Sequence, residues 1–290
     1  QDGRGASKLF TAGFPVDMFL QGDDTGDNWQ LKDRLRGQKD LATNSNAAET
    51  DNTFYYFDDQ TGLVTSSGGG SAIAQLTGYM WKRALGYFDI ATYKGNAQSS
   101  AITVNHNLGV VPEMMWCKKL NATGDWMVYH KGLNGGTNPH TYRLRLNSSG
   151  AEGTGSGVWN AAPTATQFSV GTDSDVNADA NIGFITYLFA TVSGVSKVGS
   201  YDGDGNSGRV IDCGFSNGAR FVLARSYTHA DNWVVFDSER GIVAGNDPYL
   251  RINTTDAEVN NADLIDAHSS GFIVNNTNGE LNDTGRSYIF

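Results

Sequence analysis

The chain has 290 residues, of which 36 are glycine, 39% are hydrophobic and only 18% are charged. Its formal net charge of −10 would repel phosphate backbones, so we do not expect a nucleic-acid partner. No stretch approaches about 18 consecutive apolar residues, so the sequence predicts no membrane-spanning helix. The two cysteines, Cys117 and Cys213, indicate neither a disulfide framework nor a structural zinc site.

Three related segments follow one another along the chain, about 100 residues apart. Each contains a tryptophan preceded by Asn or Asp, at Trp29, Trp126 and Trp233. Each then continues with the pattern Asn-x-x-x-Ala-Glu, at 44–49, 147–152 and 253–258. This shared order predicts three tandem modules: a divergent, N-terminally shortened one at 1–84, and fuller ones at 85–192 and 193–290.

Both ends of the chain look shortened when the modules are compared. The first module has little chain ahead of Phe14, and the third stops at Phe290 inside a strand that the other modules continue. The chain also begins with Gln1 rather than Met. We therefore expect it to be part of a longer protein.

Short apolar runs rich in Val, Ile and aromatic residues predict strands throughout. In the second module we expect strands near 87–94, 101–105, 112–119, 125–130, 141–147, 166–171 and 183–192. A short helical turn could form at each Asn-x-x-x-Ala-Glu segment, with its first residue as N-cap. The strands predict an all-β fold of three tandem antiparallel β-sandwich modules, jelly-roll or lectin-like. Stacked through short linkers, such modules would make an elongated protein.

Two stretches of the second module carry a family resemblance. HNLGVVPEMMWCKK (106–119) and GDWMVYHKGLNGGTNP (124–139) resemble a repeat in virion proteins of tailed phages, many of them marine or cyanobacterial. In the third module, NWVVFDSERGIVAGNDPYLRINTTDAE (232–258) is similar to the same repeat. The first module departs more, because it keeps Arg36-Gly37 but lacks the Asn-Asp-Pro-Tyr turn.

The resemblance implies a place on the phage particle surface, in the tail, and implies no catalytic residues. We expect a virion structural protein, a tail fibre or host-adhesion component, with other virion proteins and a host surface glycan or protein as partners. Analogy with fibres implies a homo-oligomer such as a trimer. The alternatives are a capsid decoration or tail connector that binds other virion chains, and a glycan-cleaving tailspike.

Any binding surface is expected in loops at the module ends, where the modules differ most. The candidate ligand-binding residues come from the loops at 134–140 and 244–249, and are Asn134, Asn138, His140, Asn246, Asp247 and Tyr249.

The residues that recur in the modules have a structural and a functional interpretation. The three tryptophans could stack on sugars, but a fixed strand position favours a core role. Asp33 with Arg36, and Asp237 with Arg240, could hold a polar ligand, although an ion pair at a strand end is simpler. The glutamates Glu49, Glu152 and Glu258 are interpreted as acceptors for backbone donors.

No catalytic residue is predicted, and we do not expect an enzyme. A glycosidase needs two carboxylates flanking one scissile bond, and one active site does not need the same acid in three copies. The Gly-x-Ser-x-Gly and His-Glu-x-x-His signatures are absent from the sequence, and no cofactor is implied.

One acidic loop leaves a Ca²⁺ site open. Asp202, Asp204 and Asn206 place oxygen ligands at alternating positions, as a Ca²⁺ loop does. The loop has Ser207 where such a loop has glycine, and Cys213 where it has the bidentate glutamate. A hairpin turn explains the same residues without a metal.

Overall fold

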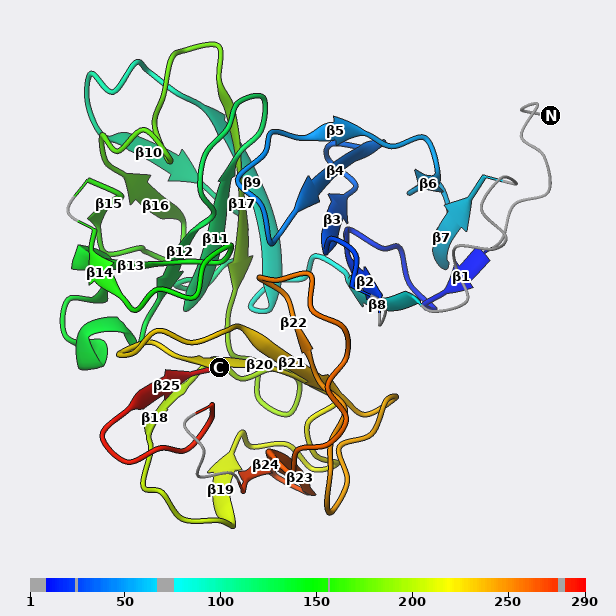
Figure 1. Ribbon diagram of the computed structural model, residues 1–290. Helices are drawn as coiled ribbons and strands as arrows, with labels where there is room; N and C mark the ends of the chain where they lie inside the picture. The colour runs from blue at the N-terminus through cyan, green and yellow to red at the C-terminus, as the bar shows by residue number, and fades with distance from the viewer. Residues whose placement is uncertain (1–8, 24–25, 67–75, 156, 276–279) are drawn as a thin grey trace.

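A computed structural model describes residues 9–23, 26–66, 76–155, 157–275 and 280–290 (Figure 1). These residues form short strands and two 3-10 helices, η1 (Leu133–Gly136) and η2 (Pro139–Thr141). The strands pair antiparallel, so the predicted all-β class is confirmed. β-Branched and aromatic side chains favour this outcome because they fit a pleated, half-buried surface.

The strands group into three lobes, each with a larger sheet and a three-stranded sheet. The first lobe contains β1 (Leu9–Thr11), β2 (Met18–Asp23), β3 (Gln30–Asp33), β4 (Lys39–Ala42), β5 (Thr50–Asp51), β6 (Tyr55–Tyr56), β7 (Gly62–Thr65) and β8 (Leu76–Trp81). Its larger sheet has the order β5-β4-β3-β2-β8, and its smaller sheet the order β1-β7-β6.

The second lobe contains β9 (Phe88–Lys94), β10 (Ile102–Asn105), β11 (Met114–Lys119), β12 (Met127–His130), β13 (Tyr142–Arg145), β14 (Gly153–Thr154), β15 (Trp159–Ala161), β16 (Gln167–Val170) and β17 (Gly183–Phe189). Its larger sheet has the order β14-β13-β12-β11-β17-β9, and its smaller sheet the order β10-β16-β15. All seven strands predicted here are confirmed. Two more, β14 and β15, are too short to show a period-2 pattern in the sequence.

The third lobe contains β18 (Ser200–Asp202), β19 (Arg209–Asp212), β20 (Phe221–Ser226), β21 (Val234–Asp237), β22 (Leu250–Arg251), β23 (Ile265–His268), β24 (Gly271–Val274) and β25 (Ser287–Ile289). Its larger sheet has the order β18-β25-β20-β21-β22, and its smaller sheet the order β19-β24-β23. The strand order of the second lobe therefore recurs in the third, with β20 in the place of β11 and β25 in the place of β17.

Each larger sheet buries both of its faces. In β11, Met115 and Cys117 pack toward the smaller sheet of their own lobe. Their neighbours Met114 and Trp116 point the other way and join a core that all three lobes share. Successive residues of a strand face opposite sides, so a strand covered on both faces must be apolar at nearly every position.

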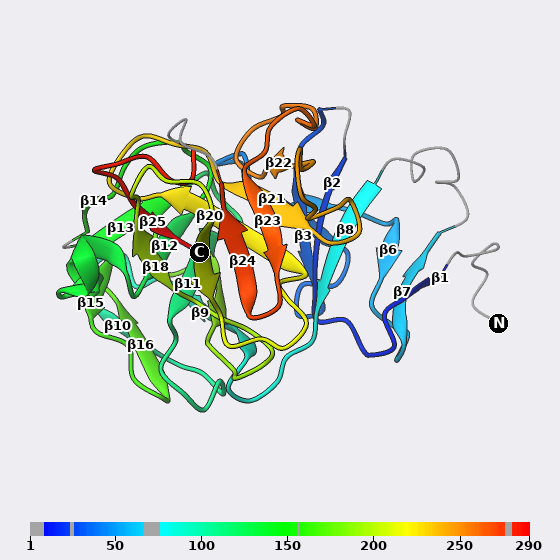
Figure 2. The same ribbon diagram turned by 90° about the horizontal axis from the view of Figure 1, so that it is seen from below.

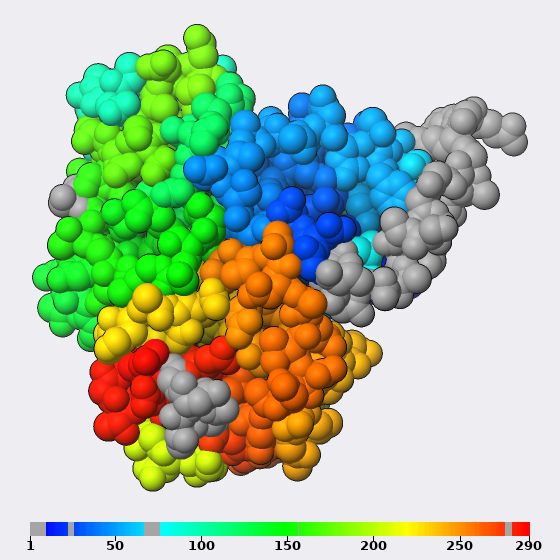
Figure 3. Space-filling model, viewed as in Figure 1, coloured from blue at the N-terminus to red at the C-terminus, as the bar shows by residue number. Residues whose placement is uncertain are grey.

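The shared core contains residues of all three lobes. The lobes accordingly lie around one centre (Figures 1, 2 and 3). Each lobe contributes matching positions of its two central strands, Leu20 and Leu31, Trp116 and Val128, and Leu223 and Val235. The linkers are tight turns closed by the bridges Ala84↔Phe88 and Val192↔Ser196. The expectation of an elongated stack is wrong, because the outer faces of the larger sheets are apolar and bury one another.

The helical turn considered at the Asn-x-x-x-Ala-Glu segments is also wrong, since none of the three is helical. In the first two segments, the backbone N–H of the glutamate bonds to the next lobe instead. The N–H of Glu49 donates to Leu120 O at 2.8 Å, and that of Glu152 donates to Tyr227 O at 2.7 Å. A helix would have used these groups internally.

Candidate functional site

The two repeated Asp-Arg pairs close the turns that follow β3 and β21. Asp33, at the end of β3, accepts the backbone N–H of Arg36 at 3.0 Å and its Nε at 2.5 Å. Gly37 follows with φ = 65°, a conformation that costs glycine no steric clash. After β21, Asp237 accepts the N–H of Arg240 at 2.9 Å and its Nε at 2.7 Å. The ion pair expected in the first and third modules is confirmed.

A tyrosine from another lobe completes each pair. Tyr187 of β17 donates to Asp33 at 2.7 Å and accepts from Arg36 at 3.3 Å. Tyr79 of β8 donates to Asp237 at 2.7 Å and accepts from Arg240 at 3.1 Å. A glutamate lies beside each arginine, at 3.5 and 3.1 Å. We call these groups the first clamp (Asp33, Arg36, Glu49, Tyr187) and the second clamp (Asp237, Arg240, Glu258, Tyr79).

The second clamp favours the ionised form of its aspartate, Asp237. Burial raises the pKa of the Tyr79 hydroxyl well above its usual value, so this group stays a donor. Burial also opposes ionisation of Asp237, but hydrogen bonds from Arg240 and Tyr79 outweigh it, and the pKa of Asp237 is lowered. A carboxylate in this state is poorly suited to exchange protons with a substrate. The clamps therefore join lobes.

Buried cations make a second set of links between lobes. Lys118 of β11 donates to Asn46 O at 3.2 Å and to Gly124 O at 2.8 Å. Arg225, at the matching position of β20, donates to three carbonyls in the 148–150 segment at 2.8 to 3.1 Å. Burial lowers the pKa of Lys118 to about 8 and that of Arg225 to about 10. The first two Asn-x-x-x-Ala-Glu segments, 44–49 and 147–152, are thus lobe junctions.

The three recurring tryptophans are buried, as the core interpretation predicts, with at most 1% of each exposed. They belong to the shared core rather than to the interior of a single sandwich. Trp126 Nε1 donates to Ala42 O of the first lobe at 2.8 Å, and Trp233 Nε1 donates to Arg145 O of the second at 3.0 Å. The indoles of Trp126 and Trp233 therefore fix the position of the preceding lobe.

The second lobe replaces the clamp by a neutral histidine. His130 stands where the other lobes have Asp33 and Asp237, and Leu133 where they have arginine. Its Nδ1 accepts the Gly132 N–H at 2.9 Å, and its Nε2 lies 3.3 Å from Phe290 O. Burial lowers the pKa of His130 to about 4. Glu152 accepts the Asn134 N–H at 2.8 Å, so of the three repeated glutamates it fits the backbone-acceptor prediction.

The buried His130 should make the protein less stable in mild acid. In the folded chain the pKa of His130 is about 4, below the ordinary 6.5. Between these two pH values the histidine is therefore protonated in the unfolded chain and neutral in the folded chain. The contribution of neutral His130 to the free energy of unfolding is complete above pH 6.5 and is lost as the pH falls toward 4, by up to about 3 kcal/mol. We expect His130→Gln to reduce this pH dependence, measured by urea unfolding at several pH values.

The exposed His229 supplies the matched control. His229→Gln removes a histidine from the surface, and should leave the difference in unfolding free energy between pH 4 and 6.5 as it is in the unaltered chain. Equal pH dependence in the His130→Gln variant and the unaltered chain would contradict the role given to His130.

The 134–140 loop presents its candidate residues around η1 and η2. Asn134 and Asn138 are both left-handed, with φ of 53° and 48°, a region that asparagine tolerates. Asn138 is exposed, while the Asn134 amide is engaged with Thr137 O at 2.6 Å. His140 is half-buried, and its Nδ1 has no hydrogen-bond partner among the described residues. Asn138 is therefore the fully exposed candidate of this loop, and His140 is accessible only in part because its Nδ1 is buried.

The 244–249 loop is built differently. Asn246 is exposed, but Asp247 is fully buried and accepts the backbone N–H groups of Val243 and Ile265 at 3.0 and 3.1 Å. Tyr249 is 3% exposed and donates to Glu280 at 2.9 Å. Burial raises the pKa of Asp247 to about 6. Asp247 and Tyr249 shape the loop from inside, which leaves Asn246 as its accessible candidate.

The carboxylates of the acidic loop that begins at the end of β18 accept hydrogen bonds from protein groups. Asp202 accepts a hydrogen bond from the Ser287 hydroxyl at 2.7 Å, and Asp204 accepts one from the Asn206 N–H at 2.9 Å. Asp204 also lies 3.3 Å from Arg209. A cation here would compete with these contacts. Over the described residues, no group of three or more His, Cys, Asp and Glu side chains is placed to hold a metal, and no helix there has the length and apolar character for a membrane crossing.

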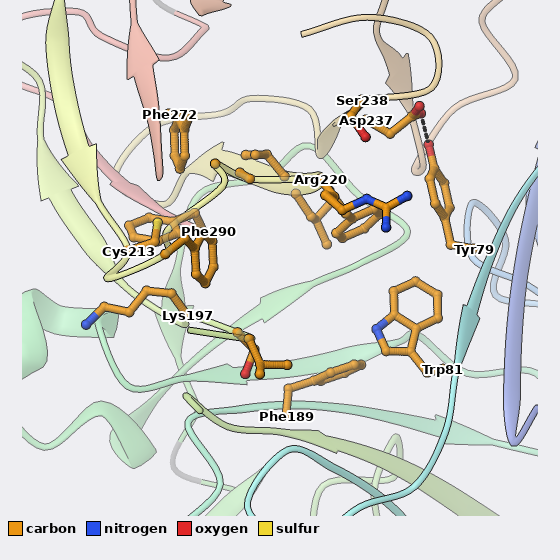
Figure 4. A pocket seen from close by; sticks show the side chains of 18 of the residues that line it. Tyr79, Trp81, Phe189, Lys197, Cys213, Arg220, Asp237, Ser238, Phe272 and Phe290 are labelled. Atoms are coloured by element: carbon orange, nitrogen blue, oxygen red, sulfur yellow. Dashed lines mark hydrogen bonds between the residues drawn. The ribbon is translucent and has the colours of Figure 1, made fainter. Parts of the chain in front are cut away.

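A pocket of about 860 Å³ opens where the three lobes meet (Figure 4). Phe272, Cys213 and Phe290 lie on one side of it, and Trp81 and Phe189 lie across from them. The sequence offered no signal for it, because its walls come from strands more than a hundred residues apart in sequence.

A family model described as a domain of unknown function matches residues 75–290. The match covers β8 and the whole of the second and third lobes. The searches of curated proteins and of solved structures find no match.

Proposed function

The chain belongs to the DUF7483 family, and we propose that it is a structural component of a phage particle surface, a tail fibre or host-adhesion component without catalytic activity. The observation that carries the binding role is the use of the recurring residues. The clamps, the buried tryptophans and the buried cations all serve to join lobes. Recognition is then left to the loops that differ between lobes.

The virion setting rests on the resemblance of the 106–119 and 124–139 segments to repeats of tailed-phage proteins. A rigid block that presents several loops suits attachment, since weak contacts add up when they are held together. Oligomers of such blocks would multiply the effect, and a homotrimer belongs to this proposal. Imaging of intact particles with this chain resolved would place it on the tail, the fibre or the capsid.

Loop variants test the binding role. We expect the purified chain to bind cultured marine or cyanobacterial cells, and the triple change Asn138→Gly, His140→Ala and Asn246→Ala to weaken binding by about tenfold or more. Glycine keeps the left-handed turn at 138. The control is Asn160→Ala, which alters an exposed asparagine on β15 outside both loops. Undiminished binding by the triple variant would remove these loops from the proposal.

A depolymerisation assay on host polysaccharide separates adhesion from cleavage. The purified chain should release no new reducing ends, because four of the repeated carboxylates are held in the clamps and Glu152 accepts a backbone N–H. Steady release of oligosaccharide would overturn the non-enzymatic proposal and favour a tailspike.

A capsid decoration or tail connector remains the second candidate. In that role, the loops that differ between lobes would contact other virion chains rather than a host surface.

A further inference from the structure

Each of the first two Asn-x-x-x-Ala-Glu segments meets the next lobe through its third residue. Asn46 O accepts the Gly124 N–H at 2.9 Å, and Ser149 O accepts the Asp231 N–H at 2.7 Å. Gly124 and Asp231 both stand two residues ahead of the recurring tryptophan of their own lobe. The junction of the first and second lobes therefore repeats this contact at the junction of the second and third.

The third lobe meets the first lobe at the equivalent place. The third residue of its segment is Thr255, and a Cβ at Gly26 of the first lobe would lie only 2.8 Å from Thr255 O. Gly26 belongs to the segment just ahead of the recurring tryptophan of its own lobe. The Thr43 hydroxyl also donates to Ile252 O at 2.7 Å across this junction. The contacts thus run from the first lobe to the second, on to the third and back to the first.

The clamps follow the same direction around the centre. The aspartate and arginine of a clamp come from one lobe, and its tyrosine comes from the next. Tyr187 brings the second lobe to the first clamp, and Tyr79 brings the first lobe to the second clamp, which belongs to the third lobe. A head-to-tail interface of this kind generates a ring when its rotation closes. The three lobes therefore form a ring with one type of junction.

One junction of the ring is closed by non-covalent contacts alone. The two linkers join the first lobe to the second and the second to the third. The first lobe is thus held on two sides, by the second lobe and by the third, while the linker at 82–87 ties it to the rest of this chain.

We propose that the lobe is the unit of assembly in this protein, and that the first lobe of a second copy of the chain can take the place between the second and third lobes. An interface that forms within one chain can form in the same way between two chains. Exchange of first lobes would give a homo-oligomer without any new contact surface. The inference is independent of host adhesion through the loops.

A cut chain tests this exchange. A protease site placed in the linker after Arg83 allows the first lobe to be separated covalently from the other two. We expect the cut protein to remain one particle in size-exclusion chromatography. Cut proteins with and without ¹⁵N label are then mixed in urea below the unfolding midpoint and returned to buffer. Native mass spectrometry should detect particles with a first lobe from one preparation and the other two lobes from the other.

Three tyrosine variants of the cut protein show which junctions hold the first lobe. Tyr187→Phe removes a clamp hydroxyl at its junction with the second lobe, and Tyr79→Phe removes one at its junction with the third. Each should speed the exchange by about tenfold, because the hydroxyl donates to a charged group. The control is Tyr93→Phe, which removes a hydroxyl that donates to Val176 O within the second lobe and should leave the rate unchanged.

Separation or unfolding of the cut protein, or a lack of mixed particles, would overturn the proposal. Faster exchange in Tyr187→Phe without faster exchange in Tyr79→Phe would indicate a linear series of lobes rather than a ring, and would overturn it as well.

Discussion

Replacing Arg36 with leucine should lower the free energy of unfolding by about 3–5 kcal/mol, because it removes the cation from a carboxylate with no exposed surface. Asp33 would keep two donors, the backbone N–H of residue 36 and the Tyr187 hydroxyl. Both are neutral and cannot replace the guanidinium charge. Urea unfolding followed by tryptophan fluorescence measures the loss, with the midpoint and the slope both reported.

A double variant shows whether the loss comes from the stranded charge. Asp33→Asn combined with Arg36→Leu removes both charges, and should recover much of the stability that Arg36→Leu alone loses. The second lobe already carries an uncharged version of the site, with His130 and Leu133 at these positions. If the double variant were as unstable as the single one, the clamp would not owe its effect to the buried ion pair.

Replacing Trp233 with alanine should be equally severe, at about 3–5 kcal/mol. The indole is fully buried in the shared core, donates to Arg145 O at 3.0 Å, and lies 5.1 Å from the Arg225 guanidinium. Its removal opens a cavity between the second and third lobes and leaves a buried carbonyl without its donor. The change should shift the unfolding of both lobes, which calorimetry and fluorescence together detect.

Trp81 provides the comparison within the same chain. It is half-buried at the edge of the pocket, so Trp81→Ala should cost about 1–2 kcal/mol. A larger loss for Trp81 than for Trp233 would mean that the shared core is not the main tie between the lobes.

The shared core also bears on the proposed adhesion role. Lobes joined by buried ion pairs and indoles keep their outer loops at fixed separations. Binding through several such loops then loses little conformational freedom, which favours avidity.

Much of the local structure follows from the sequence itself. The period-2 alternation and short apolar runs of the second module correctly predict its seven longer strands. A tryptophan at the same position of every repeat, such as Trp126, predicts burial, and the spacing of Asp33 and Arg36 predicts their ion pair. These features depend on residues close together in the chain, where steric preference and hydrogen bonding act over one turn or one strand.

The arrangement of the lobes was decided only by the tertiary structure. Tyr187 bonds to Asp33 across 154 positions of sequence, and Tyr79 bonds to Asp237 across 158. The sequence of a strand does not show whether an apolar residue faces the interior of its own sandwich or a core that is shared with the two other lobes. For the same reason Asp247 and Tyr249 look like exposed loop residues in the sequence, although the fold buries them. The three recurring segments thus predicted repeated modules, while the apolar outer faces of their sheets determined that the lobes gather around one centre.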